Sequence, residues 1–189
     1  DFQYQGKDLN LELCTFASSS AELTELQKVQ GYLAAVHVKS YVKTVDASSV
    51  LYAAWSDTTP TTDCSIYRGN YDLAAFTYVV SGSPYNDYYY TYASDQWPEK
   101  GDHSGGNDTR FSDPAMDEAL ATLKSAVDLQ AQADASKAVQ DAYIAGTPEI
   151  PLFYRAEVTG ISNHMGNWPG YAPSSFGELW NVEDWYYIP

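Results

Sequence analysis

The N-terminal part of the chain alternates between two hydrophobic periods, and this alternation constrains the fold more than any other feature. Apolar residues recur at every second position over 9–16 and again over 37–45, as they do in strands. Between these runs they recur at helical spacing over 23–33, after small hydroxyl residues that suit a helix N-cap. Asp46 can cap a further short helix over 47–55. Strand, helix, strand, helix is the order of an α/β layer, and α/β is the fold class that we predict.

The middle of the chain holds one apolar run and one long aromatic segment. Residues 56–70 are polar and rich in turn formers, which predicts a loop. The run 71–80 is nearly all apolar, carries one charge and suits a strand buried on both faces. Over 85–111, tyrosine and tryptophan residues lie among Asp, Asn, Ser and Gly. We predict a long loop there, and loops of this length usually have a function or are mobile.

Two helices are predicted in the C-terminal half. The residues at 112–114 form a helix start, with a capping side chain followed by proline. The first helix carries one apolar face and the second, over 129–144, carries a narrow alanine-rich stripe. Segment 149–154 is predicted as a short strand that its proline restricts to an edge or a crossover. The two helix faces consist of Met116, Leu120, Leu123 and Val127, and of Ala131, Ala135, Ala138, Val139 and Ala142.

Size and charge exclude several kinds of partner. The chain has 189 residues, which is the length of one domain that can bury a core. It carries 10 basic and 25 acidic residues, a formal net charge of −15. Nucleic acids and anionic lipid surfaces both require a basic face, so we predict neither as a partner. No apolar stretch approaches the length of about 18 residues that a membrane-spanning helix needs, so we expect no direct membrane insertion.

Cys14 and Cys64 are the only two cysteines, too few and too far apart for a zinc ribbon. Two alternatives remain open. The cysteines can form one disulfide, which would place the chain in an oxidising compartment. They can equally be two separate buried thiols.

No metal site, cofactor site or catalytic site is predicted. The three histidines lie in separate elements, and no pair of them has the spacing of metal ligands. Acidic and amide residues over 102–113 lack the ordered spacing of a calcium loop. Ser81 is not part of a nucleophile elbow, and no histidine lies near it in sequence. We therefore expect a protein that is not an enzyme.

Five segments, in order along nearly the whole chain, carry a resemblance to a known family. Taken together they resemble the C-terminal part of the family 5 extracellular solute-binding proteins, which are the oligopeptide, dipeptide and nickel receptors of ABC importers. The segments are Gly6-Lys7-Asp8-Leu9 through Phe16, His37-Val38 to Val45-Asp46, Asn70-Tyr71-Asp72-Leu73-Ala74, Phe111-Ser112-Asp113-Pro114-Ala115-Met116-Asp117 and Gly146-Thr147-Pro148-Glu149-Ile150-Pro151-Leu152-Phe153-Tyr154.

The resemblance implies one lobe of a type II periplasmic-binding-protein-like fold, with a mixed central sheet flanked by helices. By this correspondence residues 1–156 form the C-terminal ligand-binding lobe, and 157–189 form a tail that returns to the other lobe. The chain begins at Asp1 without an initiator methionine or a signal-like segment, so we expect it to start inside a longer protein.

The function implied by the resemblance is solute capture outside the cytoplasm, in the bacterial periplasm or on an anchored lipoprotein at the cell surface. A small molecule or an oligopeptide would be enclosed between two lobes by hinge closure. The closed receptor would then be recognised by the permease of an ABC importer. Oligopeptides are the first ligand class implied and oligosaccharides the second.

The resemblance also points to ligand-binding residues. In peptide-binding relatives an aspartate that pairs with the free amine follows the strand corresponding to 71–80. Here that position falls on or beside Ser81, next to Gly82, and the family's aromatic residue falls on Tyr78. Because a hydroxyl does not neutralise a buried ammonium, a free-amine peptide is a poor match unless Asp87 replaces the aspartate.

Aromatic rings of the following segment are the other candidates, because Tyr and Trp stack on sugar rings and on peptide side chains. We predict Tyr85, Tyr88 and Trp97 as contacts of this kind. A second hypothesis, from another class, is a stand-alone extracellular adhesion or interaction module, in which the exposed tyrosines would meet a protein partner.

Overall fold

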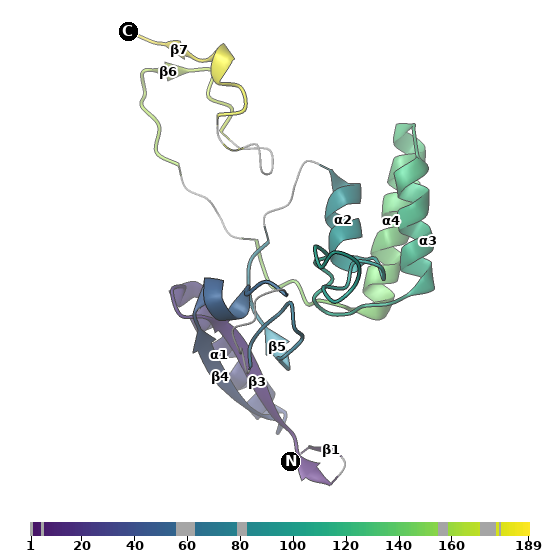
Figure 1. Ribbon diagram of the computed structural model, residues 1–189. Coiled ribbons are helices and arrows are strands. Elements are labelled where there is room, and N and C mark those ends of the chain that lie inside the picture. The colour runs from purple at the N-terminus through teal and green to yellow at the C-terminus, as the bar shows by residue number, and fades with distance from the viewer. Residues whose placement is uncertain are drawn as a thin grey trace. The chain divides into compact units, whose positions relative to one another are not determined.

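A computed structural model describes residues 2–4, 6–55, 63–78, 83–154, 159–170, 177 and 179–189 (Figure 1). The chain divides into two compact units. The first consists of Asp1–Thr77 and Tyr90–Ser112, and the second of Tyr78–Tyr89 and Asp113–Pro189. Among the described residues, no helix is long and apolar enough to cross a membrane. Each unit is described in turn.

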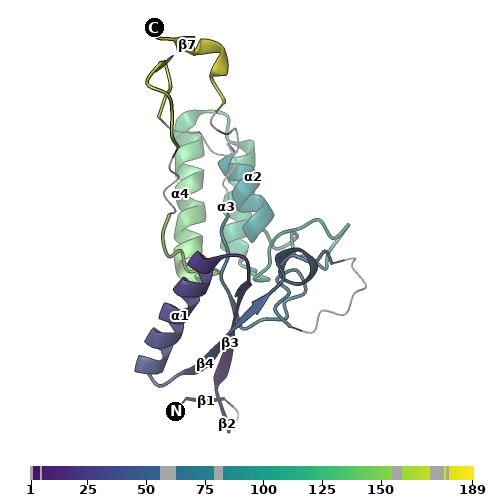
Figure 2. The same cartoon turned by 90° about the vertical axis from the view of Figure 1, so that its left-hand side faces the viewer.

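The first unit is built on a parallel sheet. Strands β3 (Asn10–Phe16), β4 (Lys39–Val45) and β5 (Leu73–Ala74) pair in the order β4-β3-β5. Helix α1 (Ser20–Ala35) connects β3 to β4 and lies against these two strands (Figure 2). The predicted strand–helix–strand order is therefore confirmed, and so is the α/β class. A small antiparallel pair, β1 (Gln3–Tyr4) and β2 (Lys7–Asp8), precedes the sheet.

Side-chain caps fix the ends of the helical segments in this unit. The hydroxyl of Ser19 accepts from the backbone N–H of Glu22 at 3.5 Å and begins α1. The carboxylate of Asp46 accepts from the backbone N–H of Ser49 at 2.8 Å and begins η1, a π-helical segment over Ala47–Leu51. The cap at Asp46 is as predicted, but the helix ends at Leu51 rather than near residue 55.

The structure decides between the two alternatives for the cysteines. Cys14 in β3 and Cys64 form a disulfide that closes a sequence separation of 50 residues. Both are fully buried and pack with Leu51 and Ile66 in the core of the first unit. The partly buried residues that pack against this core are Phe16, Val45, Val50, Tyr52, Tyr67, Tyr71, Ala74 and Phe76.

The prediction for residues 71–80 is wrong in extent and in burial. Strand β5 covers only Leu73–Ala74, and the side chain of Leu73 is 37% exposed. Within the described part of the chain β5 pairs with β3 alone and lies at the edge of the sheet, so one side has no neighbouring strand. Residues 71–78 are a mixture of half-buried and exposed positions and not a strand buried on both faces, and 79–80 lie outside the described residues.

The second correction concerns the aromatic segment after Pro84. Residues Pro84–Tyr92 form helix α2 and not a loop. Proline stands at its first position, and the Ser83 hydroxyl accepts from the backbone N–H of Asn86 at 3.4 Å. Tyrosines at 85, 88, 89 and 92 lie three or four residues apart, which is helical spacing. Tyrosine favours strands and the flanking residues favour turns, so local composition hid this periodicity.

Helices α3 (Pro114–Ser125) and α4 (Leu129–Gly146) are formed in the second unit as predicted, and they pack as an antiparallel hairpin. Asp113 and Asp128 cap their N-termini. The predicted apolar face of α3 is confirmed except for Val127. This residue is 93% exposed because α3 ends at Ser125 and the chain turns there. The buried side chains are Met116, Ala119, Leu120 and Leu123 of α3 and Ala135, Val139 and Ala142 of α4. Of the predicted α4 stripe, Ala131 is half-buried and Ala138 is exposed.

The predicted strand at 149–154 is not formed. Within the described residues its backbone joins no sheet, and Ile150, Leu152, Phe153 and Tyr154 are between 51% and 99% exposed. Near the C-terminus, β6 (Met165–Gly166) and β7 (Tyr186–Tyr187) form an antiparallel pair, with the short helix η3 (Val182–Asp184) before β7. The expected domain boundary at 156 lies within 155–158, outside the described residues, and stays a prediction.

Candidate functional site

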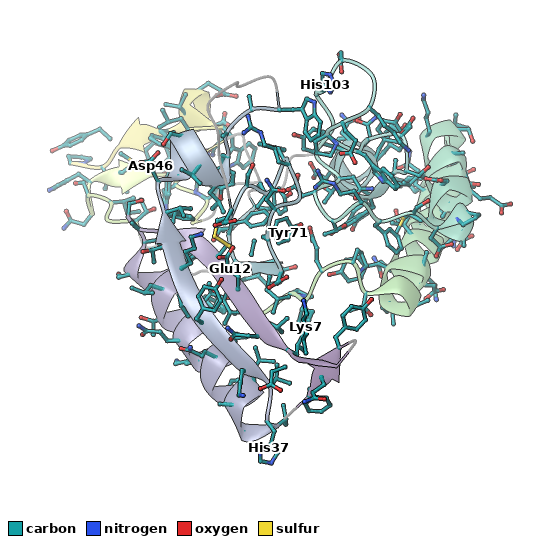
Figure 3. All side chains as sticks on the ribbon, turned by 60° about the horizontal axis from the view of Figure 1, so that its bottom comes forward. Lys7, Glu12, His37, Asp46, Tyr71 and His103 are labelled. Carbon is teal, nitrogen blue, oxygen red and sulfur yellow. A yellow bond between two sulfur atoms is a disulfide. The ribbon has the colours of Figure 1, made fainter. Side chains whose placement is uncertain are left out.

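Sheet topology marks one place in the first unit where a ligand can be held. The chain leaves β3 on one side toward β4, and the next strand, β5, lies on the other side of β3. In open parallel sheets, ligands bind at the carboxyl ends of the strands where the strand order reverses in this way. We call this region the carboxyl edge and define it by residues 16–22, 46–52 and 75–77. In Figure 3, Asp46 marks the carboxyl end of β4 and His37 lies at the opposite end of the strand.

A buried carboxylate lies at the carboxyl edge. Glu22 belongs to the first turn of α1, and only 1% of its surface is exposed. Its Oε1 accepts a hydrogen bond of 3.0 Å from the hydroxyl of Thr77, which follows β5 by three residues. The contact joins the segments that follow β3 and β5, the two strands on either side of the reversal. The carboxyl edge therefore carries a buried carboxyl group that accepts a hydrogen bond from the segment after β5.

Three aromatic rings of the carboxyl edge lie close to one another. The ring of Tyr52 lies 6.2 Å from that of Phe16 and 6.0 Å from that of Phe76, centroid to centroid. Burial raises the pKa of the Tyr52 hydroxyl, and the negative charge of Glu22 raises it further. An apolar aromatic wall next to a carboxylate suits a ligand that has both apolar and hydrogen-bonding parts.

Of the predicted site residues, three follow the carboxyl edge in sequence. Tyr78 comes directly after Thr77, and 45% of its surface is exposed. Ser81 and Gly82 lie outside the described residues. The assignment of these three residues to ligand binding stays a prediction.

Helix α2 brings three other predicted residues onto one element. Tyr85, Asp87 and Tyr88 are all half-buried, and Asp87 lies in the first turn of the helix. The ring of Tyr85 stacks on that of Tyr89 at 5.4 Å, so one face of Tyr85 is already covered. Any stacking on a ligand would use its other face.

Trp97 lies in a different environment, within the first unit. Its indole N–H donates to the backbone oxygen of Phe111 at 3.0 Å, and the ammonium group of Lys100 lies 3.9 Å from the ring centroid. Both contacts orient the ring within its own segment. A role in ligand binding is left as a prediction for this residue as well.

Sequence reasoning missed a polar cluster on the sheet. Glu12 in β3 is 9% exposed and accepts from the hydroxyl of Tyr41 at 2.9 Å and from the ammonium group of Lys43 at 3.3 Å. Lys43 also pairs with Asp63 at 2.7 Å, and this hydrogen bond is the main reason that the pKa of Lys43 is raised. The hydrogen bond to Glu12 raises the pKa of the Tyr41 hydroxyl. The available signal was a glutamate in one predicted strand and a lysine in the next, although Glu12 faces Tyr41 and Lys43 faces Cys14 in the register.

One group of metal-ligating residue types comes together in the described residues. Glu12, Cys14 and Cys64 place ligand atoms within 4.8 Å of one another. The two sulfur atoms are joined in the disulfide, so they are not the thiolates that a metal ion requires.

Comparisons with known proteins identify the fold. No family model and no curated protein matches the chain. Solved structures do match. The chain superposes on NikZ from Campylobacter jejuni, in complex with Ni(L-His), with a TM-score of 0.70 and 16% identity, over 98% of this chain and 34% of NikZ. The chain therefore has the fold of part of NikZ. It spans about a third of the length of NikZ.

Two further structures give the same result. A periplasmic oligopeptide-binding protein of an ABC transporter from Thermotoga maritima matches with a TM-score of 0.64 and 18% identity, over 79% of this chain and 26% of that protein. AppA from Bacillus subtilis, in complex with a nonapeptide, matches with a TM-score of 0.61 and 16% identity, over 99% of this chain and 33% of AppA. The resemblance to family 5 solute-binding proteins is thus confirmed at the level of the fold.

Proposed function

We propose that this chain is a ligand-binding lobe of an extracytoplasmic solute receptor that delivers its ligand to the permease of an ABC importer. The observation that carries the proposal is the superposition on NikZ over 98% of the chain. The disulfide between Cys14 and Cys64 supports an oxidising compartment, because disulfides are rare in the cytosol. The chain acts by binding and does not catalyse a reaction.

The mechanism is hinge closure. A ligand that bridges two lobes stabilises the closed form over the open form by its differential affinity for the two. The carboxyl edge is this chain's share of the ligand contacts. Thr77 provides a polar contact there, with its hydroxyl held by the buried carboxylate of Glu22, and the partly buried rings of Tyr52 and Phe76 provide the apolar wall. The ATPase of the importer, and not this chain, supplies the energy for transport.

Oligopeptides are the first ligand class and oligosaccharides the second. Relatives in fold include a receptor bound to a nonapeptide, which supports peptides. Ser81 at the position of the family's aspartate favours ligands without a free amine. The carboxylate of Asp87, in the first turn of α2, is the acidic group that would pair with a peptide ammonium. The predicted stacking residues Tyr78, Tyr85, Tyr88 and Trp97 serve either class.

The test is thermal unfolding of the protein encoded by the whole coding region that contains this chain, with pooled oligopeptides or pooled oligosaccharides. A ligand at 100 times its Kd stabilises the native state by about 2.7 kcal/mol, which a rise in melting temperature reports. We expect one pool to raise it. Tyr78→Ala should reduce the rise, whereas Tyr32→Ala, at a 73% exposed position of α1, should leave it unchanged.

The outcomes separate the ligand classes. A peptide hit that Asp87→Asn weakens, with acetylated peptides unaffected by the change, identifies a bound ammonium. A sugar hit that is insensitive to Asp87→Asn identifies stacking instead. If neither pool shifts the melting temperature, the receptor proposal fails. The adhesion module, which the exposed rings of Tyr32, Tyr154 and Tyr187 favour, then takes its place.

A further inference from the structure

A concave surface lies in the first unit, away from the carboxyl edge. A groove of about 520 Å³ runs between the C-terminal half of α1 and the beginning of β4. It lies at the amino end of β4, where Figure 3 labels His37, whereas Asp46 and the carboxyl edge lie at the other end of the strand. The volume falls within the range of small-molecule sites, roughly 300–1,000 Å³. Gln27, Gln30, Gly31, Ala34, His37, Val38, Lys39 and Ser40 line it.

The small residues Gly31 and Ala34 on one face of α1 leave space for the groove. Gln27, Gln30, Gly31 and Ala34 are spaced by three and four residues and so lie on the same side of α1. A Cβ atom added to Gly31 would meet no other atom within 4 Å. The space above Gly31 is therefore open, and a larger side chain at this position would fill it.

The groove is lined by polar groups that the fold does not use. The side chains of Gln27 and His37 make no hydrogen bond within the described part of the chain. The Ser40 hydroxyl also has no partner there, although it is buried. Gln30 donates from Nε2 to the Ser40 carbonyl at 2.8 Å, which leaves its Oε1 and a second N–H for another contact. Amide, imidazole and hydroxyl groups both donate and accept hydrogen bonds.

His37 takes an unfavourable backbone conformation at the rim of the groove. Its φ is +63°, and its N–H bonds to the carbonyl of Ala34 just past the end of α1. Glycine is preferred at this position because a Cβ costs about 1 kcal/mol in left-handed backbone. An imidazole is therefore present where the backbone alone would favour glycine.

Charge selects the class of ligand. An anion is disfavoured, because Lys39 already pairs with Asp8 at 2.7 Å and because α1 ends here without a basic residue in its last turn. A cation is disfavoured, because no carboxylate lines the groove. Addition of a peptide strand to the edge of β4 is disfavoured as well, since Gln30 already occupies the Ser40 carbonyl.

We propose that this groove binds a neutral, hydroxyl-rich small molecule, such as a mono- or oligosaccharide, through Gln27, Gln30 and His37. The site is separate from the carboxyl edge and does not depend on the function proposed for it.

The proposal is tested by titrating the isotope-labelled chain with cellobiose and with maltotriose while its backbone amide NMR signals are followed, with trialanine as a charged comparison. We expect at least one sugar to shift the signals of Gly31 and Ser40, with a Kd on the order of 1 mM or below, and trialanine to leave them in place. Gly31→Leu should weaken binding about tenfold or more by filling the open space. Gly31→Ala should keep most of it, and neither change harms the helix, since both residues favour helix over glycine.

Three results would overturn the proposal. Sugar-induced shifts confined to Ser19, Ser49 and Thr77 would place the sugar at the carboxyl edge, in support of the proposed receptor function and against a site in this groove. Equal affinity of Gly31→Leu and the unmodified chain would exclude the groove. Absence of any shift up to about 10 mM of either sugar would show that the groove holds no such ligand.

Discussion

At the scale of single residues, Arg110 joins two segments of the first unit that are far apart in sequence. Its guanidinium donates to the backbone oxygens of Ile66 at 2.9 Å and Tyr67 at 2.7 Å, which lie 44 and 43 residues away. It also donates to the carbonyl of Asp108 and pairs with Glu99 at 3.2 Å. The turn that contains Cys64 is thereby fixed at two points, by a disulfide and by an arginine.

We expect Arg110→Met to lower the free energy of unfolding by about 2–3 kcal/mol, because charged hydrogen bonds are worth roughly 1.5–3 kcal/mol each and several carbonyls lose their donor together. Urea titration followed by circular dichroism measures this. Lys137→Met is the matched control, since the pair of Lys137 with Asp141 is exposed and such pairs contribute about 0.5 kcal/mol or less. Equal losses in the two variants would contradict the role assigned to Arg110.

Residue-scale prediction from sequence succeeded where the chemistry is local. The caps at Ser19, Asp46 and Asp113 follow from a short side chain placed before an amphipathic run, and the structure forms all three. The disulfide could not be decided, because the pairing of Cys14 and Cys64 depends on the distance between segments that are 50 residues apart. The burial of Glu22 was missed for the same reason, since its partner Thr77 follows another strand.

At the scale of elements, the helical hairpin of the second unit depends on a small number of buried side chains. Leu120 is 2% exposed in α3, and Leu129, at the start of α4, is 85% exposed. Leu120→Ala should therefore cost about 2–4 kcal/mol of stability by leaving a cavity, whereas Leu129→Ala should cost no more than about 0.5 kcal/mol. Thermal unfolding of both variants measures the difference. Similar losses would mean that the hairpin does not bury the face described above.

The contribution of the η1 cap to stability depends on pH. Hydrogen bonds from the backbone and hydroxyl of Ser49 lower the pKa of Asp46 from its usual 3.8. The carboxylate therefore stabilises the fold fully above about pH 5, and this contribution is lost as the pH falls through the lowered pKa of the folded state. The stability difference between the unmodified chain and Asp46→Ala should shrink from about pH 6 to pH 3. The difference from Asp46→Asn, which keeps a capping oxygen, should stay small at neutral pH.

Element prediction failed where neighbours, rather than local pattern, decide the outcome. An apolar run such as 71–80 becomes a strand buried on both faces only if other elements cover both faces of the sheet, and Leu73 of β5 is 37% exposed. The aromatic residues of α2 favour strands individually, yet their spacing matches one helix face. Both errors came from weighing composition above spacing and context.

At the scale of the whole molecule, the disulfide, the parallel sheet and the turn held by Arg110 all belong to the first unit, whereas the hairpin of α3 and α4 belongs to the second. Covalent stabilisation is therefore confined to one part of the chain. The candidate carboxyl edge lies in that same part, so the geometry of Thr77, Tyr52 and Phe76 depends on the bond between Cys14 and Cys64.

Reduction of the disulfide should consequently destabilise one unit and spare the other. For a separation of 50 residues, the loop-entropy model gives a contribution of about 4 kcal/mol. Hydrogen exchange measured by mass spectrometry should show that reduction lowers protection in β3, α1 and β4 and leaves α3 and α4 unchanged. The double variant Cys14→Ser with Cys64→Ser should resemble the reduced chain and should not respond to reductant. Equal loss of protection in α3 and α4 would show instead that the two units unfold as one cooperative body, and the stability of the carboxyl edge would then depend on the whole chain.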